Sequence, residues 1–513
     1  MAMDAREILA HYNVPDAMPL DYAGAFNLEP AKRFSCVTPA NELWKIIAAL
    51  HIFERAGLSS NELEFSTHHD ALQNVAADLQ DLFKFLTDTS VRISIRPRPP
   101  VLGEQTLLEQ FSSQEPIVLF SPGLDSLAAA LATNESCRPV LLHVSTSNIM
   151  LAKARELRNR YPVLLADTMV SGDCRFSSLG GGISHTRGLL FLSAAFNAAL
   201  TLGITRIIIG ENGPLMINPS VSPFSVPTRN AHPKLIEGFQ KIIQKLGYPE
   251  IHLAAMHKDM TKSEVLLGVS EKLGSLASKS YSCSITQGQT AMCGLCFACF
   301  VRKTSMLAIG VVEPDSLYEA DPFAVDIKTL GPVDQGRVND LKDSMTYFKQ
   351  FIIGPHPNDW LDEIPSSFFT DPDAMLRRFA LDLFVGTRRY FRLRESKGST
   401  NALSKYCLDA IGEIGSHTLD EREAELGKGT RRAPDQMLLG QSPQSQRGST
   451  ASMMASSKGQ GSQMVSHHRV PKHSIAIDSV LTQHLIMAHQ LVRQRSTTLS
   501  FRSLISRRTV PVV

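Results

Sequence analysis

The sequence predicts an α/β protein built on a doubly wound parallel sheet. From residue 116 onward, short apolar segments alternate with segments of helical periodicity, as parallel strands and their covering helices do. One of the apolar segments ends in a turn of small residues at 121–126, and a dense group of cysteines follows near residue 290. Residues 116–308 are therefore expected to form the central, functional domain.

Residues 1–115 precede this pattern and are expected to form an α+β accessory domain. Residues 41–57 have helical apolar periodicity, with Asn41 as the expected N-cap. Residues 91–96 alternate between apolar and polar side chains, as an edge or half-buried strand does. The proline-rich run at 96–100 interrupts regular structure and marks the expected domain boundary.

The central domain is expected to alternate strands with helices. The expected strands are 116–120, 139–144, 162–168, 205–210 and 250–255. The expected helices are 126–133, 148–160, 184–202, 231–246 and 261–273. The last of these begins with Thr261-Lys-Ser-Glu264, which is a capping-box sequence. A ligand is expected at the carboxyl edge of the sheet, where open α/β folds bind their ligands.

The C-terminal part of the chain divides by composition. Residues 309–426 are expected to be a helical region. Residues 427–475 are rich in Gly, Ser, Gln and Lys and poor in large apolar side chains, which predicts a disordered segment. Residues 476–513 are expected to hold one short amphipathic helix and a tail.

Charge and hydropathy narrow the class of protein. The formal net charge of +2 over 513 residues disfavours binding to nucleic acid or anionic membrane over the whole surface. There is no signal-like N-terminus and no run of 18 apolar residues, so we expect no membrane partner and a cytoplasmic protein. Arg377-Arg378 and the stretch from Arg388 to Arg394 combine basic and aromatic residues. They are compatible with nucleic-acid contact, although a solvated helix face is favoured.

Residues 121–126, Ser-Pro-Gly-Leu-Asp-Ser, have the form of a phosphate-binding turn between a strand and a helix. Backbone N–H groups at Ser121, Gly123 and Leu124, with the Ser126 hydroxyl, are suited to hold phosphate there. Asp125 would orient the loop or hold Mg²⁺. The alternative is a plain strand–turn–helix junction capped by serine.

Four of the eight cysteines are clustered with the spacing C-x9-C-x2-C-x2-C, and they are Cys283, Cys293, Cys296 and Cys299. Four thiolates suit tetrahedral Zn²⁺ and leave no open position for a substrate, so a structural zinc site is expected. Ordinary buried thiols and a redox Cys-x-x-Cys pair are the alternatives.

The turn at 121–126 resembles the Ser-Gly-Gly-x-Asp-Ser loop of the PP-loop ATP pyrophosphatases. The resemblance implies a Rossmann-like domain of the PP-loop (HUP) type that uses ATP and Mg²⁺ to adenylate an oxygen of its substrate. This chain departs from that loop at Pro122, which stands where the family has glycine and has no N–H to offer to a phosphate.

The order of loop, sheet and cysteines further resembles the 7-cyano-7-deazaguanine synthase (QueC) family. The stretch that begins His185-Thr-Arg187 and the strand end Gly210-Glu211-Asn212 also resemble that family's motifs. The resemblance implies that Asp125, Ser126 and Arg187 take part in catalysis. It also implies that the strand end helps to bind nucleotide, substrate or metal. A surface ion pair for Arg187 and a helix-capping turn for the strand end are the alternatives.

The family's substrate loop, Tyr-Pro-Asp-Cys-Arg, is absent after Asn212, and the chain has large extra regions. In this it resembles the QueC-like components of anti-phage defence systems, of the QatC type. We therefore expect an ATP-dependent ligase that activates a 7-deazaguanine-like or protein carboxylate and forms an amide or nitrile, with defence-complex proteins as partners. The alternatives are a nucleotide-binding scaffold altered at Pro122 and a tRNA sulfur-insertion enzyme.

Overall fold

The structure is a computed structural model that describes residues 3–14, 20–23, 38–99, 115–145, 147–161, 165, 168–174, 184–219, 221, 228–286, 291–355, 363–394 and 401–428. All of these belong to one compact unit, Met1–Pro443. Residues from 429 on lie outside this described part of the chain. The predictions of a disordered segment at 427–475 and of a helix and tail at 476–513 fall almost wholly on them.

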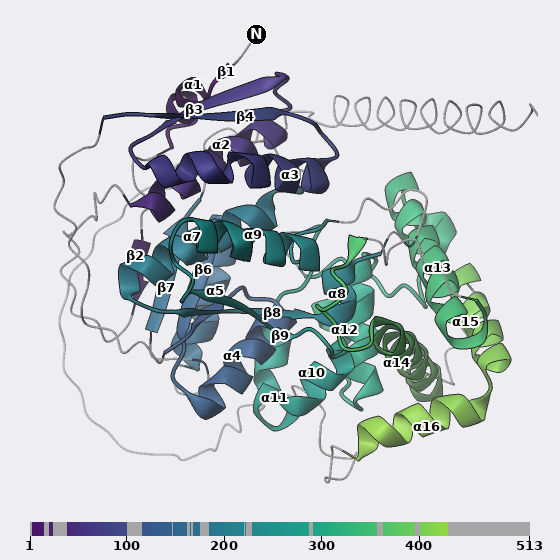
Figure 1. Cartoon of the computed structure of the whole chain (residues 1–513). Helices are drawn as coiled ribbons and strands as arrows, with labels where there is room; N and C mark the ends of the chain where they lie inside the picture. The colour runs from purple at the N-terminus through teal and green to yellow at the C-terminus, as the bar shows by residue number, and fades with distance from the viewer. Residues whose placement is uncertain are drawn as a thin grey trace, which may run out of the picture. The chain divides into compact units, whose positions relative to one another are not determined.

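The centre of the fold is a six-stranded sheet in the order β2-β7-β6-β5-β8-β9 (Figure 1). The strands are β2 (Leu20–Ala23), β5 (Ile117–Leu119), β6 (Val140–Ser145), β7 (Thr168–Asp173), β8 (Arg206–Asn212) and β9 (His252–His257). All neighbouring pairs are parallel except β2 with β7. The predicted parallel α/β sheet is confirmed, with an added antiparallel edge strand.

Successive side chains of the central strands point into two different cores, as the pleat requires. Ile117 and Val140 belong to one buried cluster, whereas Val118 and Leu141 belong to another. Helices α4 (Leu124–Ser136), α5 (Asn148–Arg160), α10 (Lys262–Gly268) and α11 (Ser270–Lys279) contribute to the second cluster. Helices α7 (Arg187–Leu202) and α9 (Pro233–Lys245) contribute to the first. Helices therefore cover both faces of the sheet.

Two predicted elements of the central domain differ from the structure. The strand expected at 162–168 lies instead at Thr168–Asp173. Leu165 donates its N–H to the carbonyl of Tyr161 at 3.0 Å, which is a helical i to i−4 bond. The prediction failed here because a short apolar run does not by itself distinguish helix from strand. The helix expected at 261–273 is divided into α10 and α11 at Val269, whose ψ of 12° leaves the helical region.

The N-terminal residues form a second, three-stranded parallel sheet in the order β1-β3-β4. Its strands are β1 (Met3–Asp4), β3 (Glu62–Thr67) and β4 (Arg92–Pro97), and its helices are α1 (Ala5–His11), α2 (Pro39–Arg55) and α3 (Ala76–Thr87). The prediction that Asn41 caps the helix is wrong. Thr38 caps it by accepting the Asn41 N–H at 3.1 Å, because proline at position 39 is well suited to the first helical turn.

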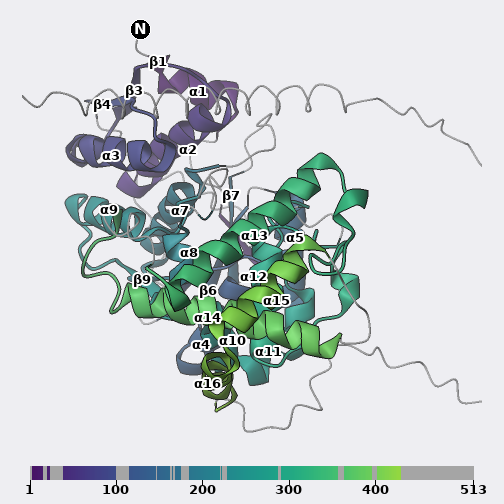
Figure 2. The same cartoon turned by 90° about the vertical axis from the view of Figure 1, so that its right-hand side faces the viewer.

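The C-terminal part is helical, as predicted, with α13 (Pro332–Ile353), α14 (Pro372–Leu393), α15 (Ala402–Ile414) and α16 (Ser416–Gly427), and it packs against α12 (Phe297–Ala308), the last helix of the predicted central domain. Helix α14 packs against the other four (Figure 2). Its partner α12 begins after Cys296 and carries Cys299 in its first turn, so the C-terminal helices are attached to the central domain at the cysteines.

Candidate functional site

The candidate site lies where strand order reverses. The chain runs from β5 to β6 and β7 on one side of β5, then crosses to β8 on the other side. The loop 121–126 follows β5, and Glu211 and Asn212 end β8. Where the connections after two neighbouring parallel strands run to opposite sides, a crevice opens at the carboxyl ends of those strands. The predicted phosphate loop and the predicted strand-end residues are therefore brought together.

Gly210 lets β8 approach the helix that follows the loop. A Cβ on Gly210 would lie 2.6 Å from the Cβ of Ala129 and 3.2 Å from the carbonyl oxygen of Asp125. Any side chain there would push the first turn of α4 away from the strand. Gly210 thus sets the distance between the two halves of the crevice.

The loop is closed by its two serines. The Ser126 hydroxyl donates to the Ser121 carbonyl at 2.7 Å and accepts the Ser121 N–H at 3.0 Å. The Gly123 N–H donates to the Ser121 hydroxyl at 3.2 Å, and the Leu124 N–H lies 3.5 Å from the Ser282 hydroxyl. No described residue accepts the N–H groups of Asp125 and Ser126 in the first turn of α4, which leaves both as donors for an anion.

Asp125 is held by two side chains from other elements, one at the start of a helix and one at the end of a strand. Lys262, at the start of α10, forms an ion pair with Oδ2 of Asp125, and its side chain is only 3% exposed. The Asn212 amide donates to Oδ1 at 2.9 Å. Both carboxylate oxygens are thus engaged, which favours loop orientation over metal binding as the role of Asp125. Sequence reasoning missed Lys262, although its place directly after the cap Thr261 was a usable signal.

The C-terminal helices hold the helix start that carries Lys262. The Thr261 hydroxyl donates to the buried Asp382 of α14 at 2.5 Å. Arg422 of α16 bonds both Asp382, at 2.7 Å, and Glu264, at 2.8 Å. Glu264 closes the predicted capping box by accepting the Thr261 N–H at 2.8 Å. The region beyond residue 309 therefore supports the side of the crevice that carries Lys262.

Glu211 and Arg187 are ionisable neighbours at the same edge. Burial, and then the negative charge of Asp125, raise the pKa of Glu211 to about 8, while Lys262 and Arg187 act in the opposite direction. Arg187 is exposed to solvent, but protein atoms still surround part of its side chain. The resulting desolvation, and then the positive charge of Arg55, lower the pKa of Arg187. No ion pair of Arg187 is found within the described part of the chain, which leaves its guanidinium available to an anion.

The start of α7, which carries Arg187, is fixed by contacts from two other segments. The Asn230 side chain accepts the Gly188 N–H at 3.0 Å, and a Cβ on Gly188 would lie 2.0 Å from the Asn230 carbonyl oxygen. Glu54 of α2 accepts the N–H groups of His185 and Thr186 at 2.8 and 3.1 Å. Sequence reasoning missed Glu54, because nothing local marks a carboxylate that caps a helix 131 residues away.

The four predicted cysteines form one buried cluster whose sulfurs lie within 4.8 Å of one another. Backbone N–H groups point at two of the sulfurs, from Cys293 to Cys283 at 3.5 Å and from Cys296 to Cys293 at 3.4 Å. Gly294 has φ +77°, and a Cβ there would lie 1.8 Å from the Ala320 carbonyl oxygen. Four gathered thiols with N–H donors fit a tetrahedral Zn²⁺ site.

The cysteine cluster is joined to the phosphate loop. The Tyr281 N–H donates to the Pro122 carbonyl at 2.6 Å. Arg302, one turn after Cys299, is fully buried and donates to the hydroxyls of Ser280 and Ser282 at 2.9 and 3.3 Å. Its charge is balanced by Glu313 at 2.6 Å. The segment between cluster and loop is thus fixed on both sides.

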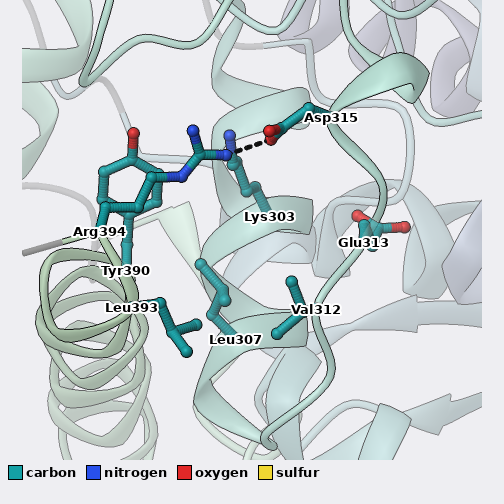
Figure 3. Close-up of a pocket in the computed structure, with 8 residues that line it drawn as sticks. All are labelled: Lys303, Leu307, Val312, Glu313, Asp315, Tyr390, Leu393 and Arg394. Atoms are coloured by element: carbon teal, nitrogen blue, oxygen red, sulfur yellow. Dashed lines mark hydrogen bonds and ion pairs between the residues drawn. The ribbon is translucent and has the colours of Figure 1, made fainter. Parts of the chain in front are cut away.

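The basic stretch of α14 is paired with acidic residues. Arg388 and Arg389 both bond Glu423 of α16, and Arg394 bonds Asp315. Nearby, a small pocket between α12 and α14 is lined by Lys303, Leu307, Val312, Glu313, Asp315, Tyr390, Leu393 and Arg394 (Figure 3). Lys303 and Tyr390 both contact Asp321, so the polar groups of this region are matched internally.

The fold and the site together define an α/β protein with a phosphate loop at the switch point of its sheet and a closed cysteine cluster beside it. Residues 182–310 match the family model described as queuosine biosynthesis protein QueC. Over 235 residues the chain is 28% identical to a 7-cyano-7-deazaguanine synthase from Myxococcus xanthus (strain DK1622), an alignment that covers 40% of this chain and 97% of that protein. No solved structure matches the chain significantly.

The two matches support a QueC-like protein of the PP-loop superfamily. They confirm the predicted resemblance to the QueC family and support an ATP-dependent function of the QueC type. Among the described helices, none is both long and apolar enough to span a membrane.

Proposed function

We propose that this protein is an ATP-dependent ligase that activates a carboxylate as its adenylate and then forms an amide or a nitrile. The substrate class is a 7-deazaguanine-like acid. The observation that carries the proposal is the phosphate loop at the switch point, with Asp125 fixed by Lys262 and Asn212 and with two N–H donors of α4 left without partners in the described part of the chain.

The residues divide into two groups around the crevice. The N–H groups of Asp125 and Ser126 bind the phosphates of ATP, and the Ser126 hydroxyl keeps the loop closed around them. Arg187 neutralises charge on the phosphates or on the substrate carboxylate, for which a guanidinium fork is well suited. The carboxylate oxygen attacks the α-phosphorus and the bond to pyrophosphate breaks, so negative charge grows where these fixed donors already point.

Glu211 is the carboxylate of this edge that is suited to the Mg²⁺ of Mg·ATP. Among the described residues, the hydrogen bonds to its side chain come from Asn212 alone, whose side-chain amide lies at 3.4 Å, whereas both oxygens of Asp125 are occupied by separate side chains. When bound, Mg²⁺ neutralises charge on the phosphate oxygens. Glu211 must then ionise, and a nearby cation favours that form.

The cysteine cluster is proposed to hold one structural Zn²⁺ ion. With four sulfurs gathered, no ligand position remains for substrate, and all four cysteines are used together. This disfavours the alternative of tRNA sulfur insertion, which needs a free reactive thiol. The paired arginines of α14 also offer little to nucleic acid.

A role in anti-phage defence, with protein partners from the same system, is supported by the regions outside the QueC match, which the simple biosynthetic enzyme does not need. The second candidate function is a nucleotide-binding scaffold. It is favoured by Pro122, which lacks an N–H and gives its carbonyl to Tyr281.

The test is pyrophosphate release from Mg·ATP in the presence of ammonium and 7-carboxy-7-deazaguanine. Release is expected in the wild-type protein and is expected to be lost in Asp125→Ala and Ser126→Ala. Ser278→Ala is the matched control, because its hydroxyl is exposed and bonds only within α11. ATP binding without substrate-dependent release would select the scaffold.

A further inference from the structure

A carboxylate–histidine pair lies where the N-terminal helix α2 meets the start of α7. Oε1 of Glu54 accepts both the His185 N–H at 2.8 Å and a hydrogen bond from Nδ1 of the His185 ring at 2.9 Å. Oε2 of Glu54 accepts the hydroxyl of Thr186 at 2.5 Å. The Glu54 side chain is 12% exposed and the His185 side chain 25%, so the pair is sheltered but reachable.

The partners determine which ring nitrogen carries the proton. Burial acts to raise the pKa of Glu54, but hydrogen bonds from His185 and Thr186 hold it at about 2, so this carboxylate is ionised at neutral pH. An ionised carboxylate only accepts, so in the neutral form of His185 the proton is on Nδ1 and Nε2 has the lone pair. Within the described residues Nε2 has no partner. A neutral imidazole oriented in this way is the arrangement of a general base.

The pair lies at the start of α7, which the topology places at the carboxyl edge of the sheet. Helix α7 follows β7 and precedes β8, so its first residues lie at the carboxyl ends of the strands, as the phosphate loop does. His185 is two residues before Arg187, whose charge acts on Glu211. Glu54 lies outside the segment that matches the QueC model, residues 182–310. The N-terminal region thus contributes a side chain to the site.

We propose that His185 is the general base of the C–N bond-forming half-reaction and that Glu54 is its positioning residue. The inference rests on the proposed function. Ammonia forms a bond to the acyl carbon of the adenylate, and the bond from that carbon to the AMP oxygen breaks. One proton of the new ammonium group passes to Nε2 of His185, which gives the amide, AMP and an imidazolium that returns its proton to water.

The experiment measures the two half-reactions separately in the full chain. Substrate-dependent exchange of pyrophosphate into ATP reports adenylation, and ammonium-dependent AMP and amide production reports the second step. The principal variant is His185→Asn, which keeps an N–H donor for Glu54 but has no basic nitrogen. His185→Gln serves if His185→Asn does not fold, and His417→Asn is the control, because His417 is 87% exposed on α16.

His185→Asn is expected to lower amide formation by about 100-fold or more, as the loss of a general base does, and to leave exchange nearly unchanged. Glu54→Gln is expected to lower amide formation by about 10-fold, because a positioning partner contributes less. Hydroxylamine, whose protonated adduct is more acidic than that of ammonia and loses its proton to water, is expected to give the hydroxamate and AMP in His185→Asn.

Two results would overturn this inference alone: amide formation unchanged in His185→Asn and His185→Gln, or exchange and amide formation lowered equally. Failure of hydroxylamine to restore product would also count against the base. Absence of exchange in the wild-type protein is a different result, because it overturns the proposed function and this inference with it.

Discussion

The ion pair between Lys262 and Asp125 gives the sharpest test of how the site is built. Lys262→Met removes the charge and keeps an unbranched side chain of similar length. Asp125 is then left with the Asn212 amide and no counter-charge, at a position where its side chain is 18% exposed. We expect the free energy of unfolding to fall and the orientation of the phosphate loop to be lost.

The magnitude follows from the burial of both groups. Removing one partner of a buried pair costs about 3–5 kcal/mol, because the other charge remains uncompensated. Asn212 still bonds Asp125, so the lower end, about 3 kcal/mol, is expected. The matched control is Lys272→Met. Lys272 pairs with Glu135, but the two side chains are 37% and 50% exposed, and such a surface pair contributes about 0–1 kcal/mol.

The assay is urea unfolding followed by circular dichroism, with ATP binding measured on the same samples. The double variant Asp125→Asn/Lys262→Met removes both charges and is expected to recover at least half of the stability lost in Lys262→Met. Equal stability of wild-type and Lys262→Met, or a double variant no more stable than Lys262→Met, would refute the reasoning.

Three further predictions follow from the same structure. The pKa of Glu211 is raised from 4.5 to about 8, so the folded protein keeps a proton that the unfolded chain loses, and stability falls as pH rises from 4.5 to 8. Glu211→Gln should flatten that fall, as unfolding midpoints at pH 5 and pH 8 would show. Gly294→Ala, at φ +77° and 1.8 Å from the Ala320 carbonyl oxygen, should lower the zinc content of the purified protein. Gly268→Ala, with nothing within 4 Å, should not. Arg302→Met leaves the buried Glu313 without its cation and should cost about 3–5 kcal/mol by urea unfolding; a loss below about 1 kcal/mol, typical of an exposed pair, would contradict it.

The local elements were predictable where the signal was local. The strand that ends at Leu119 and the four cysteines follow from short-range pattern and spacing, and the structure brings the cysteines together. Two of the wrong predictions, a strand position and a helix N-cap, arose where the same residues are compatible with two different local structures. An apolar run before Thr168 suits helix as well as strand, and Thr38 and Asn41 are both good N-cap residues until the proline between them is considered.

The sequence by itself determined the alternation of strands and helices, the phosphate turn and the cysteine cluster, because each depends on residues close together in the chain. Only the tertiary structure decided which side chains complete the site. Lys262 reaches Asp125 across 137 residues, and Glu54 reaches His185 across 131. Such pairs depend on strand order and helix packing, which bring several helix starts to one edge of the sheet. No local pattern records that arrangement, because the two partners of each pair lie far apart in the chain.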